Sequence, residues 1–293
     1  MNTNPSRLAA CCICVAAFLC PALHGQDSIA PATATQYQAK PEGQIQNKLD
    51  PKALVIINRA ADFLAKAPQY QATVEVSHDV VYGEKSKLQY TKQLDIKLRR
   101  PNRLKVDVST TVPRRSFWYD GKNVTLLDHK ENYYASSLAP DKIDAMVDHV
   151  EKTLGVVFPL DDLVLSKPLS EPASKAKNSA YLGKEKILGK VCHHVAFGHE
   201  AIDWQAWVED GPKPLLRKVV ITLKYEEGLP QITAFISNWD TGTKLPDYVF
   251  EFEAPKGAEA IKFLASSDDS PDAEKDKSPA PARVPAVDVK AGN

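Results

Sequence analysis

The sequence has no excess of charge of either sign. It contains 37 basic and 37 acidic side chains, so its formal net charge at pH 7 is zero. Proteins that bind nucleic acids usually carry a basic excess that replaces counterions on the phosphates. We therefore expect no nucleic-acid partner, and an anionic membrane surface is disfavoured as the main partner for the same reason.

Cysteine is scarce and is concentrated at one end of the chain. Four of the five cysteines lie within the first 20 residues, in an apolar run without charges from residue 8 to residue 23. Arg7 precedes the run and small residues follow it, with Gly25 at the expected cleavage point, which is the pattern of an export signal. We therefore predict a signal peptide over residues 1–25 and a periplasmic protein. An uncleaved membrane anchor is the alternative, although about sixteen apolar residues fall short of the ~20 that span a bilayer.

Motifs for catalysis and cofactor binding are also missing. Removal of the signal leaves Cys192 alone, so no disulfide is expected within the chain. The sequence contains neither Gly-x-Ser-x-Gly nor His-Glu-x-x-His, and its 13 glycines form no phosphate-binding loop. We predict that the protein is not an enzyme, with no catalytic residue, no cofactor and no metal.

Two segments have too few apolar residues to form a core. Residues 26–49 are rich in Ala, Thr, Gln and Pro and are predicted to be a flexible spacer. Residues 266–293 consist mainly of Ser, Asp, Pro, Ala and Lys, and are predicted to be a disordered tail. One folded domain is expected between them, over residues 50–265.

The domain opens with an amphipathic helix. Asp50 can accept hydrogen bonds from the free N–H groups at a helix start, and Pro51 suits the first helical position. Apolar residues then recur at helical spacing as far as Leu64, and Pro68 lies just beyond the end. A second stripe predicts another helix further along the chain; its members are Ile143, Met146, Val147, Val150 and Leu154.

Most of the remaining domain alternates apolar and polar residues with a period of two. One apolar face and one polar face are typical of strands in an antiparallel sheet. The apolar rows of the first two runs are Tyr70, Ala72, Val74, Val76, His78, Val80 and Tyr82, then Leu88, Tyr90, Leu94, Ile96 and Leu98. Further runs follow, the last two being Ile232–Trp239 and Tyr248–Phe252.

The order of helix, strands, helix and strands predicts an α+β fold. A sheet of this size has to twist and curl. We therefore expect a large curled antiparallel sheet, a half-barrel of about eleven or twelve strands, with two main helices on its concave side. An apolar cleft is expected under these helices.

Cysteine and histidine occur together at Cys192-His193-His194, which could indicate a metal site. On a strand, however, neighbouring side chains point to opposite faces, so the three cannot bind one ion. A structural role is favoured, and His193 is expected to be buried or half-buried. His78, alone on an apolar face, is interpreted as a core histidine, and the Asp161-Asp162 pair as a helix start or solvated surface.

Aromatic and apolar side chains are the remaining candidates for a binding site. The four tryptophans all lie on predicted strands, where core packing is the simplest interpretation. The functional interpretation is that some of them line a cleft for acyl chains. The residues predicted to line the cleft are Trp118, Trp204, Trp207, Met146 and Val150.

Three neighbouring segments resemble a known family. Residues 189–197 (GKVCHHVAF) are followed by residues 203–209 (DWQAWVE) and 214–218 (PLLRK). This succession resembles an uncharacterised family of predicted periplasmic proteins, a domain of unknown function, in which a second proline replaces Leu216. The pattern residues Cys192, His194 and Arg217 are interpreted as structural, and no catalytic role is transferred to them.

The end of the domain resembles a second group. Residues 250–258 (FEFEAPKGA) are similar to the strand end of the outer-membrane lipoprotein carrier (LolA-like) proteins. The resemblance spans about residues 50–265 and implies the carrier-like half-barrel with an apolar cleft. It supplies no activity, because fold alone does not fix function.

The function expected from these features is a periplasmic carrier or binder of a hydrophobic ligand, such as a lipid or a lipoprotein acyl chain. The alternative is a sensor or interaction protein that regulates an envelope response through an inner-membrane partner. A hydrolase that uses His78 or His194 is the third hypothesis. We expect a monomer.

Overall fold

The structure is a computed structural model that describes residues 48–82, 86–110, 114–155, 160, 163–166 and 169–263. All of these belong to the second of the two units into which the chain divides, residues 41–293. The predicted signal peptide, most of the predicted spacer, the predicted tail and the Asp161-Asp162 pair lie outside the described residues.

Helix α1 (Pro51–Lys66) begins and ends where the sequence predicts. A carboxylate oxygen of Asp50 accepts hydrogen bonds from the backbone N–H groups of Lys52 and Ala53, at 2.8 and 3.4 Å. Pro51 occupies the first turn, where no partner exists for its missing N–H. Helix α2 (Ile143–Leu154) ends at Gly155, whose left-handed backbone suits glycine.

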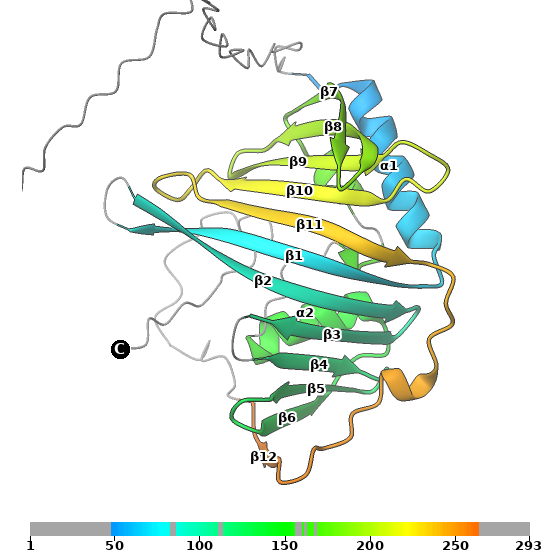
Figure 1. The fold of residues 1–293 in the computed structure, drawn as a ribbon, viewed down its shortest axis with the longest axis vertical. Coiled ribbons are helices and arrows are strands. Elements are labelled where there is room, and N and C mark those ends of the chain that lie inside the picture. The colour runs from blue at the N-terminus through cyan, green and yellow to red at the C-terminus, as the bar shows by residue number, and fades with distance from the viewer. Residues whose placement is uncertain are drawn as a thin grey trace, which may run out of the picture. The chain divides into compact units, whose positions relative to one another are not determined.

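Twelve strands form one sheet in the order β12-β6-β5-β4-β3-β2-β1-β11-β10-β9-β8-β7 (Figure 1). Neighbouring strands are antiparallel except for the parallel pair β12–β6. The strands are β1 (Gln69–Tyr82), β2 (Ser86–Arg99), β3 (Arg103–Ser109), β4 (Arg115–Tyr119), β5 (Asn123–Asp128), β6 (Tyr133–Leu138), β7 (Asn178–Ile187), β8 (Lys190–Gly198), β9 (Ile202–Glu209), β10 (Leu216–Leu223), β11 (Gln231–Asp240) and β12 (Glu259–Ile261). The short helices are α3 (Ser170–Ser174) and the 3₁₀ turn η2 (Asp247–Val249).

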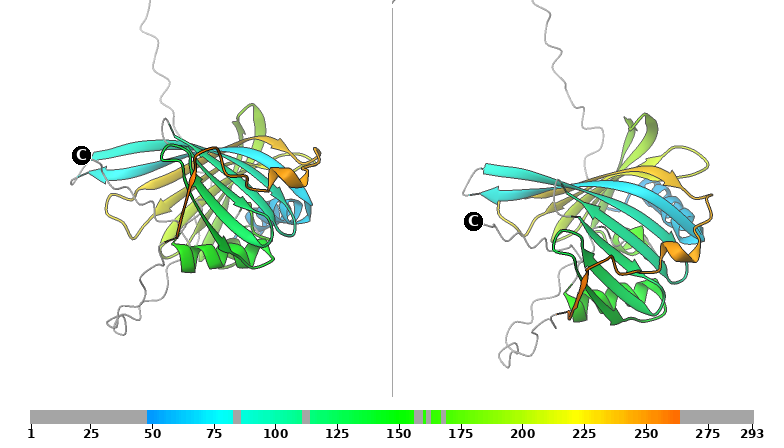
Figure 2. Two further views of the ribbon diagram at one scale, coloured as in Figure 1. Left: turned by 90° about the horizontal axis from the view of Figure 1, so that it is seen from below. Right: turned by 60° about the horizontal axis from the view of Figure 1, so that its bottom comes forward.

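The sheet consists of two up-and-down meanders. Strands β1 to β6 pair in chain order, and strands β7 to β11 do the same. The two meanders meet along a single seam, the antiparallel pair β1–β11, which brings residues 71–78 beside residues 232–240. Figure 2 shows the sheet arching over the helices as a half-barrel.

One face of the sheet is covered by the helices, and we call it the inner face; the opposite face is the outer face. On β1 the buried side chains of Val74 and Val76 point inward, while Glu75 between them points outward. The inner side chains of the sheet form one hydrophobic cluster with the apolar stripes of α1 and α2. The predicted α+β half-barrel with its two main helices on the concave side is therefore confirmed.

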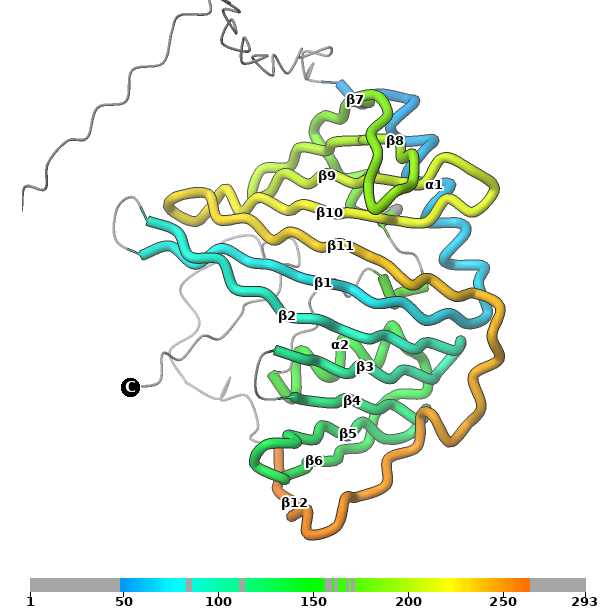
Figure 3. The backbone as a smooth tube through the Cα atoms, viewed as in Figure 1, coloured from blue at the N-terminus to red at the C-terminus, as the bar shows by residue number. Residues whose placement is uncertain are grey.

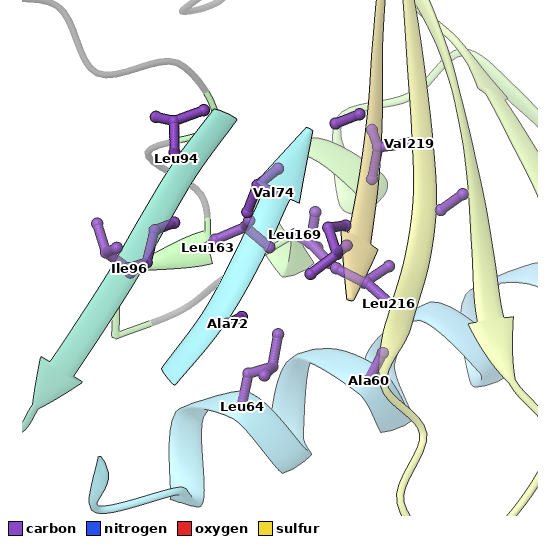
Figure 4. Packing of buried hydrophobic residues seen from close by; sticks show 14 of the residues in the cluster. Ala60, Leu64, Ala72, Val74, Leu94, Ile96, Leu163, Leu169, Leu216 and Val219 are labelled. Carbon is purple, nitrogen blue, oxygen red and sulfur yellow. The ribbon is translucent and has the colours of Figure 1, made fainter. Parts of the chain in front are cut away.

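A further segment lies on the inner face between the two helices. Leu163 and Leu169 are buried in the same hydrophobic cluster as Val74 of β1 and Leu64 of α1 (Figure 4). The hydroxyl of Tyr70 on β1 donates a hydrogen bond to the carbonyl oxygen of Leu163. This part of the inner face is therefore packed by the protein's own side chains.

The strand predicted over residues 248–252 is not formed. After β11 the chain runs along the ends of the strands to β12, and we call residues 241–258 the strap (Figure 3). Both sides of β11 are already paired, with β1 and β10, so the strap cannot pair with the strand that it follows. Arg99 holds it by hydrogen bonds to the carbonyl oxygen of Leu245 and to the carboxylate of Asp247.

Candidate functional site

Three of the five predicted cleft residues lie in the main hydrophobic cluster. Met146 and Val150 of α2 are fully buried, and Trp204 of β9 is 4% exposed. The ring of Trp204 stacks on Phe197 at a centroid distance of 4.3 Å. These side chains therefore contribute to the core, as the simplest interpretation of the tryptophans predicts.

The other two lie on the outer face. Trp118 alternates with the inner residues Phe117 and Tyr119 of β4, and its ring packs against Phe252 of the strap at 5.1 Å. Trp207 is three residues from Trp204 on the same strand, so it points to the opposite side of the sheet. The five predicted residues do not line a common surface.

The hairpin of β1 and β2 extends beyond its neighbours. Pairing between β1 and β11 ends at His78, and pairing between β2 and β3 ends at Gln93. Beyond these positions the two strands form a ribbon that projects from the sheet, as the cyan and teal hairpin in Figures 1 and 2 shows. The inner rows of both strands continue into this ribbon.

We call the inner side chains of the ribbon the hairpin patch: His78, Val80, Tyr82, Leu88 and Tyr90. Among them, Tyr82, Leu88 and Tyr90 are 44%, 51% and 42% exposed. His78 stacks on Tyr90, directly opposite on the partner strand, with ring centroids 5.8 Å apart. Exposed apolar side chains gathered in one place are typical of a binding surface.

The row on β2 also contains a charge. Lys92 lies opposite Val76, between Tyr90 and Leu94, so it points to the inner face. It is half-buried, and burial lowers the pKa of its ammonium group. Lys92 was not predicted as a site residue because only the apolar members of the inner row were considered. The signal that identifies Lys92 is its position: a lysine at an inward position of a run with period two.

The family-pattern residues form a separate cluster on the outer face. His194 Nδ1 donates to the carboxylate of Glu185 at 2.9 Å, and its Nε2 lies 2.9 Å from Oε1 of Gln205. Trp207 Nε1 donates to the other carboxylate oxygen at 2.8 Å, and its ring stacks on His194 at 4.0 Å. We call Glu185, His194, Gln205 and Trp207 the outer cluster.

The charge of Glu185 is stabilised by these neighbours. Burial raises the pKa of its carboxyl group, but the hydrogen bond from Trp207 and the nearby His194 outweigh this effect and lower it below the ordinary value. Lys218 adds a cation–π contact, with its ammonium nitrogen 4.5 Å from the centre of the Trp207 ring. The outer cluster therefore ties β7, β8, β9 and β10 together.

Cys192 and Arg217 flank this cluster. Cys192 is fully buried, and burial raises the pKa of its thiol to about 11, so the reactive thiolate is scarce at neutral pH. Arg217 donates two hydrogen bonds to one carboxylate oxygen of Glu209. Cys192 packs with Trp207 of β9 and Val220 of β10, and Arg217 connects β10 to β9.

The structure places His193 on the other side of β8 from Cys192 and His194. Its side chain is 14% exposed and lies 3.0 Å from Asp210 and 3.2 Å from the hydroxyl of Tyr181. Its half-buried position is the one that the alternation of the strand predicts. Over the described ranges, no three His, Cys, Asp or Glu side chains are grouped as metal ligands.

A grouping of Ser116, His129 and Asp107 on the outer face was not predicted. The hydroxyl of Ser116 donates a hydrogen bond to Asp107. The ring nitrogen Nε2 of His129 lies 2.8 Å from the oxygen of that serine hydroxyl. Because a hydroxyl has one proton, His129 has to act as donor here and cannot deprotonate the serine. The grouping therefore lacks the arrangement of a catalytic triad, in which the histidine accepts that proton.

The described residues define an α+β half-barrel protein: a curled, mainly antiparallel sheet with its helices on the inner face. None of the helices within those residues is long and apolar enough to cross a bilayer. The chain belongs to the family described as predicted periplasmic protein (DUF2092), whose model matches residues 53–264. The predicted family and the predicted periplasmic localisation are thereby confirmed. No curated protein sequence matches the chain.

Solved structures of similar fold include lipoprotein LppX of Mycobacterium tuberculosis, with 15% identity and a TM-score of 0.44 over 67% of this chain and 100% of that one. LprF of Mycobacterium bovis has 12% identity and a TM-score of 0.41, over 68% and 98% of the two chains. A LolA superfamily protein of Nitrosomonas europaea has 9% identity and a TM-score of 0.33, over 68% and 97%. Similarities at this level identify no ligand and no partner.

Proposed function

We propose that this protein binds a hydrophobic ligand, a lipid or the acyl chain of a lipoprotein, on the inner face of its half-barrel in the periplasm. The observation that carries the proposal is the hairpin patch. There the apolar rows of β1 and β2 continue beyond the helices, and three large side chains remain exposed. The ligand would cover these side chains.

Hydrophobic transfer is sufficient for such binding. Each buried methylene contributes roughly 0.8 kcal/mol, so an acyl chain that buries about eight of them gains about 6 kcal/mol. Part of this gain offsets the cost of immobilising the chain. The two strands of the ribbon are hydrogen-bonded to each other from Val76 to Tyr82. This pairing lowers the cost because the backbone that carries the patch is already ordered.

This function requires no catalytic group. The Cys192 thiol is mostly protonated at neutral pH, and the Ser116 hydroxyl already donates its proton to Asp107. His78, one of the two histidines considered for a hydrolase, lies in the hairpin patch with no acid bonded to its ring among the described residues. These features support a binding protein in preference to a hydrolase.

Native mass spectrometry tests the proposal on protein purified from the periplasm of an expressing bacterium. We expect co-purified lipid, and displacement of a fluorescent fatty acid by unlabelled fatty acid. Leu88→Ser is expected to weaken binding about three- to tenfold, because it removes exposed apolar surface from the patch.

Leu138→Ser is the matched control, because Leu138 is also exposed on a strand but lies at the far end of β6. Absence of co-purified lipid together with absence of probe binding would overturn the proposal, as would equal binding by the two variants. Recovery of a stable membrane-protein complex without any lipid would favour the sensor function instead.

A further inference from the structure

On the inner face of strands β1 and β2, as far as the structure describes them, one side chain is charged, that of Lys92. The other inner residues of the two strands are apolar, aromatic or uncharged, from Tyr70 to Tyr82 and from Ser86 to Leu98. The carboxylates of the two strands, Glu75, Asp79 and Asp95, all alternate to the outer face. Within these two strands, an ammonium group therefore lies in an apolar row without a carboxylate beside it on the same face.

Two of these outer carboxylates, Asp79 and Asp95, have partners of their own. Asp79 lies 3.9 Å from the ammonium nitrogen of Lys87 and accepts a hydrogen bond from the backbone of Gln231. Asp95 accepts a hydrogen bond from the hydroxyl of Thr73 at 2.8 Å. Among the described residues, Lys92 has neither an ion pair nor a hydrogen bond.

His78 provides a second polar group at the same place. Both of its ring nitrogens are buried, and neither has a hydrogen-bond partner among the described residues. His78 pairs with Tyr90, and Lys92 pairs with Val76, so the two polar residues are diagonal neighbours across the hairpin. Diagonal positions on an antiparallel pair are roughly 7–8 Å apart, a gap that one acidic group can bridge.

Electrostatics agrees with this placement. Burial lowers the pKa of His78, and the positive charge of Lys92 lowers it further, against a smaller opposing effect of the Asp79 carboxylate on the outer face. Burial of an ammonium group without a counter-charge costs free energy, which an anion would recover by pairing with it. The apolar side chains of the hairpin patch begin next to these two groups and continue to the end of the ribbon.

We infer that the ligand is an anionic amphiphile, whose acidic head group pairs with Lys92 and accepts a hydrogen bond from His78 while its chain lies along the hairpin patch. This inference rests on the proposed function and narrows it to one class of ligand. The head group is defined by its negatively charged oxygens, as in a carboxylate or a phosphate monoester.

Four probes with the same chain test the inference by competition against a fluorescent fatty acid: dodecanoate, dodecyl phosphate, dodecanol and dodecyltrimethylammonium. The two anionic probes are expected to bind about tenfold more tightly than dodecanol, because they add one charge-assisted contact. The cationic probe is expected to bind most weakly. Inorganic phosphate serves as a head group without a chain, and we expect it not to compete.

Lys92→Met keeps the apolar stem of the side chain and removes its charge. We expect this variant to bind dodecanol as the wild type does and to lose the preference for anionic probes, whereas Lys92→Arg retains it. Lys87→Met is the matched control, because Lys87 lies on the outer face of the same strand. Thermal unfolding of each variant shows whether it is folded.

The outcomes separate this inference from the proposed function. If all four probes bind equally, or if Lys92→Met keeps the anionic preference, the inference is overturned while hydrophobic binding stands. Competition by inorganic phosphate at the concentration of dodecyl phosphate would also overturn it, because the site would then bind a free anion. If no probe binds, the proposed function itself fails.

Discussion

His194→Ala is expected to destabilise the fold without affecting ligand binding, because the outer cluster lies on the opposite face from the hairpin patch. The substitution removes a ring stacked at 4.0 Å on Trp207 and two hydrogen bonds of 2.9 Å. A stacked pair contributes about 0.5–1.5 kcal/mol, and a hydrogen bond about 0.5–1.5 kcal/mol net.

Solvent at Glu185 reduces the expected loss of stability below the sum of these contributions. The Glu185 side chain is 47% exposed, so water can replace its lost hydrogen bond, whereas His194 itself is largely buried. We therefore expect a loss of about 1–4 kcal/mol in the free energy of unfolding. For a domain of this size, that corresponds to a fall in Tm of about 2–16 °C.

Urea and thermal unfolding, followed by far-UV circular dichroism, measure this loss, and fatty-acid displacement measures binding on the same samples. Lys186→Ala is the control, because Lys186 is an exposed residue of the same strand as Glu185. An unchanged unfolding midpoint combined with lost ligand binding would refute the structural role of the outer cluster. The family-pattern residues would then belong to a binding surface.

Two further predictions concern the strap and the outer face. Phe252→Ala is expected to lower the free energy of unfolding by about 1–3 kcal/mol, because it opens a gap beside Trp118 and Tyr134. It should also speed amide hydrogen exchange in β12. The control Tyr248→Ala, at a residue 74% exposed, should change neither quantity. Burial raises the pKa of Asp107, but the Ser116 hydrogen bond and the charges of Lys105 and Arg114 lower it overall. Its folded-state pKa is thus below the unfolded value of about 3.9, so its stabilisation is complete above about pH 4 and is lost as the pH falls through the folded-state value. Asp107→Asn should therefore flatten the acid limb of urea-derived stability between pH 2 and 6, and parallel curves for the two proteins would contradict this.

The strands and helices could be predicted because each carries its own local signal. The alternation in β1 and β2 identifies the buried face residue by residue, and Asp50 with Pro51 fixes the start of α1. The strap carries the same alternation at residues 248–252 but forms no strand. A segment also needs a neighbouring strand with an unpaired edge before it can form a strand. A local pattern does not indicate which strands lie next to each other in the sheet, so this failure could not be predicted.

The site was predicted less well for a similar reason. Period two alone places Trp204 and Trp207 on opposite faces of the sheet, so the sequence already indicated that both could not line one cleft. The packing of Leu163 and Leu169 on the inner face could not have been predicted, because that segment has no period and its position depends on long-range contacts. The inward position of Lys92 could have been predicted, because it follows from the same alternation that identified the strand.

The arrangement of the two meanders has a consequence for how the chain is assembled. Helix α1 precedes the first meander in the sequence, yet its main strand contacts are with β7, β8 and β9 of the second. During synthesis the apolar stripe of α1 therefore emerges more than one hundred residues before the strands that cover it, since it ends at Lys66 and β7 begins at Asn178. Until β7, β8 and β9 have formed, this stripe lacks the strands that cover it and is a surface that a chaperone can hold.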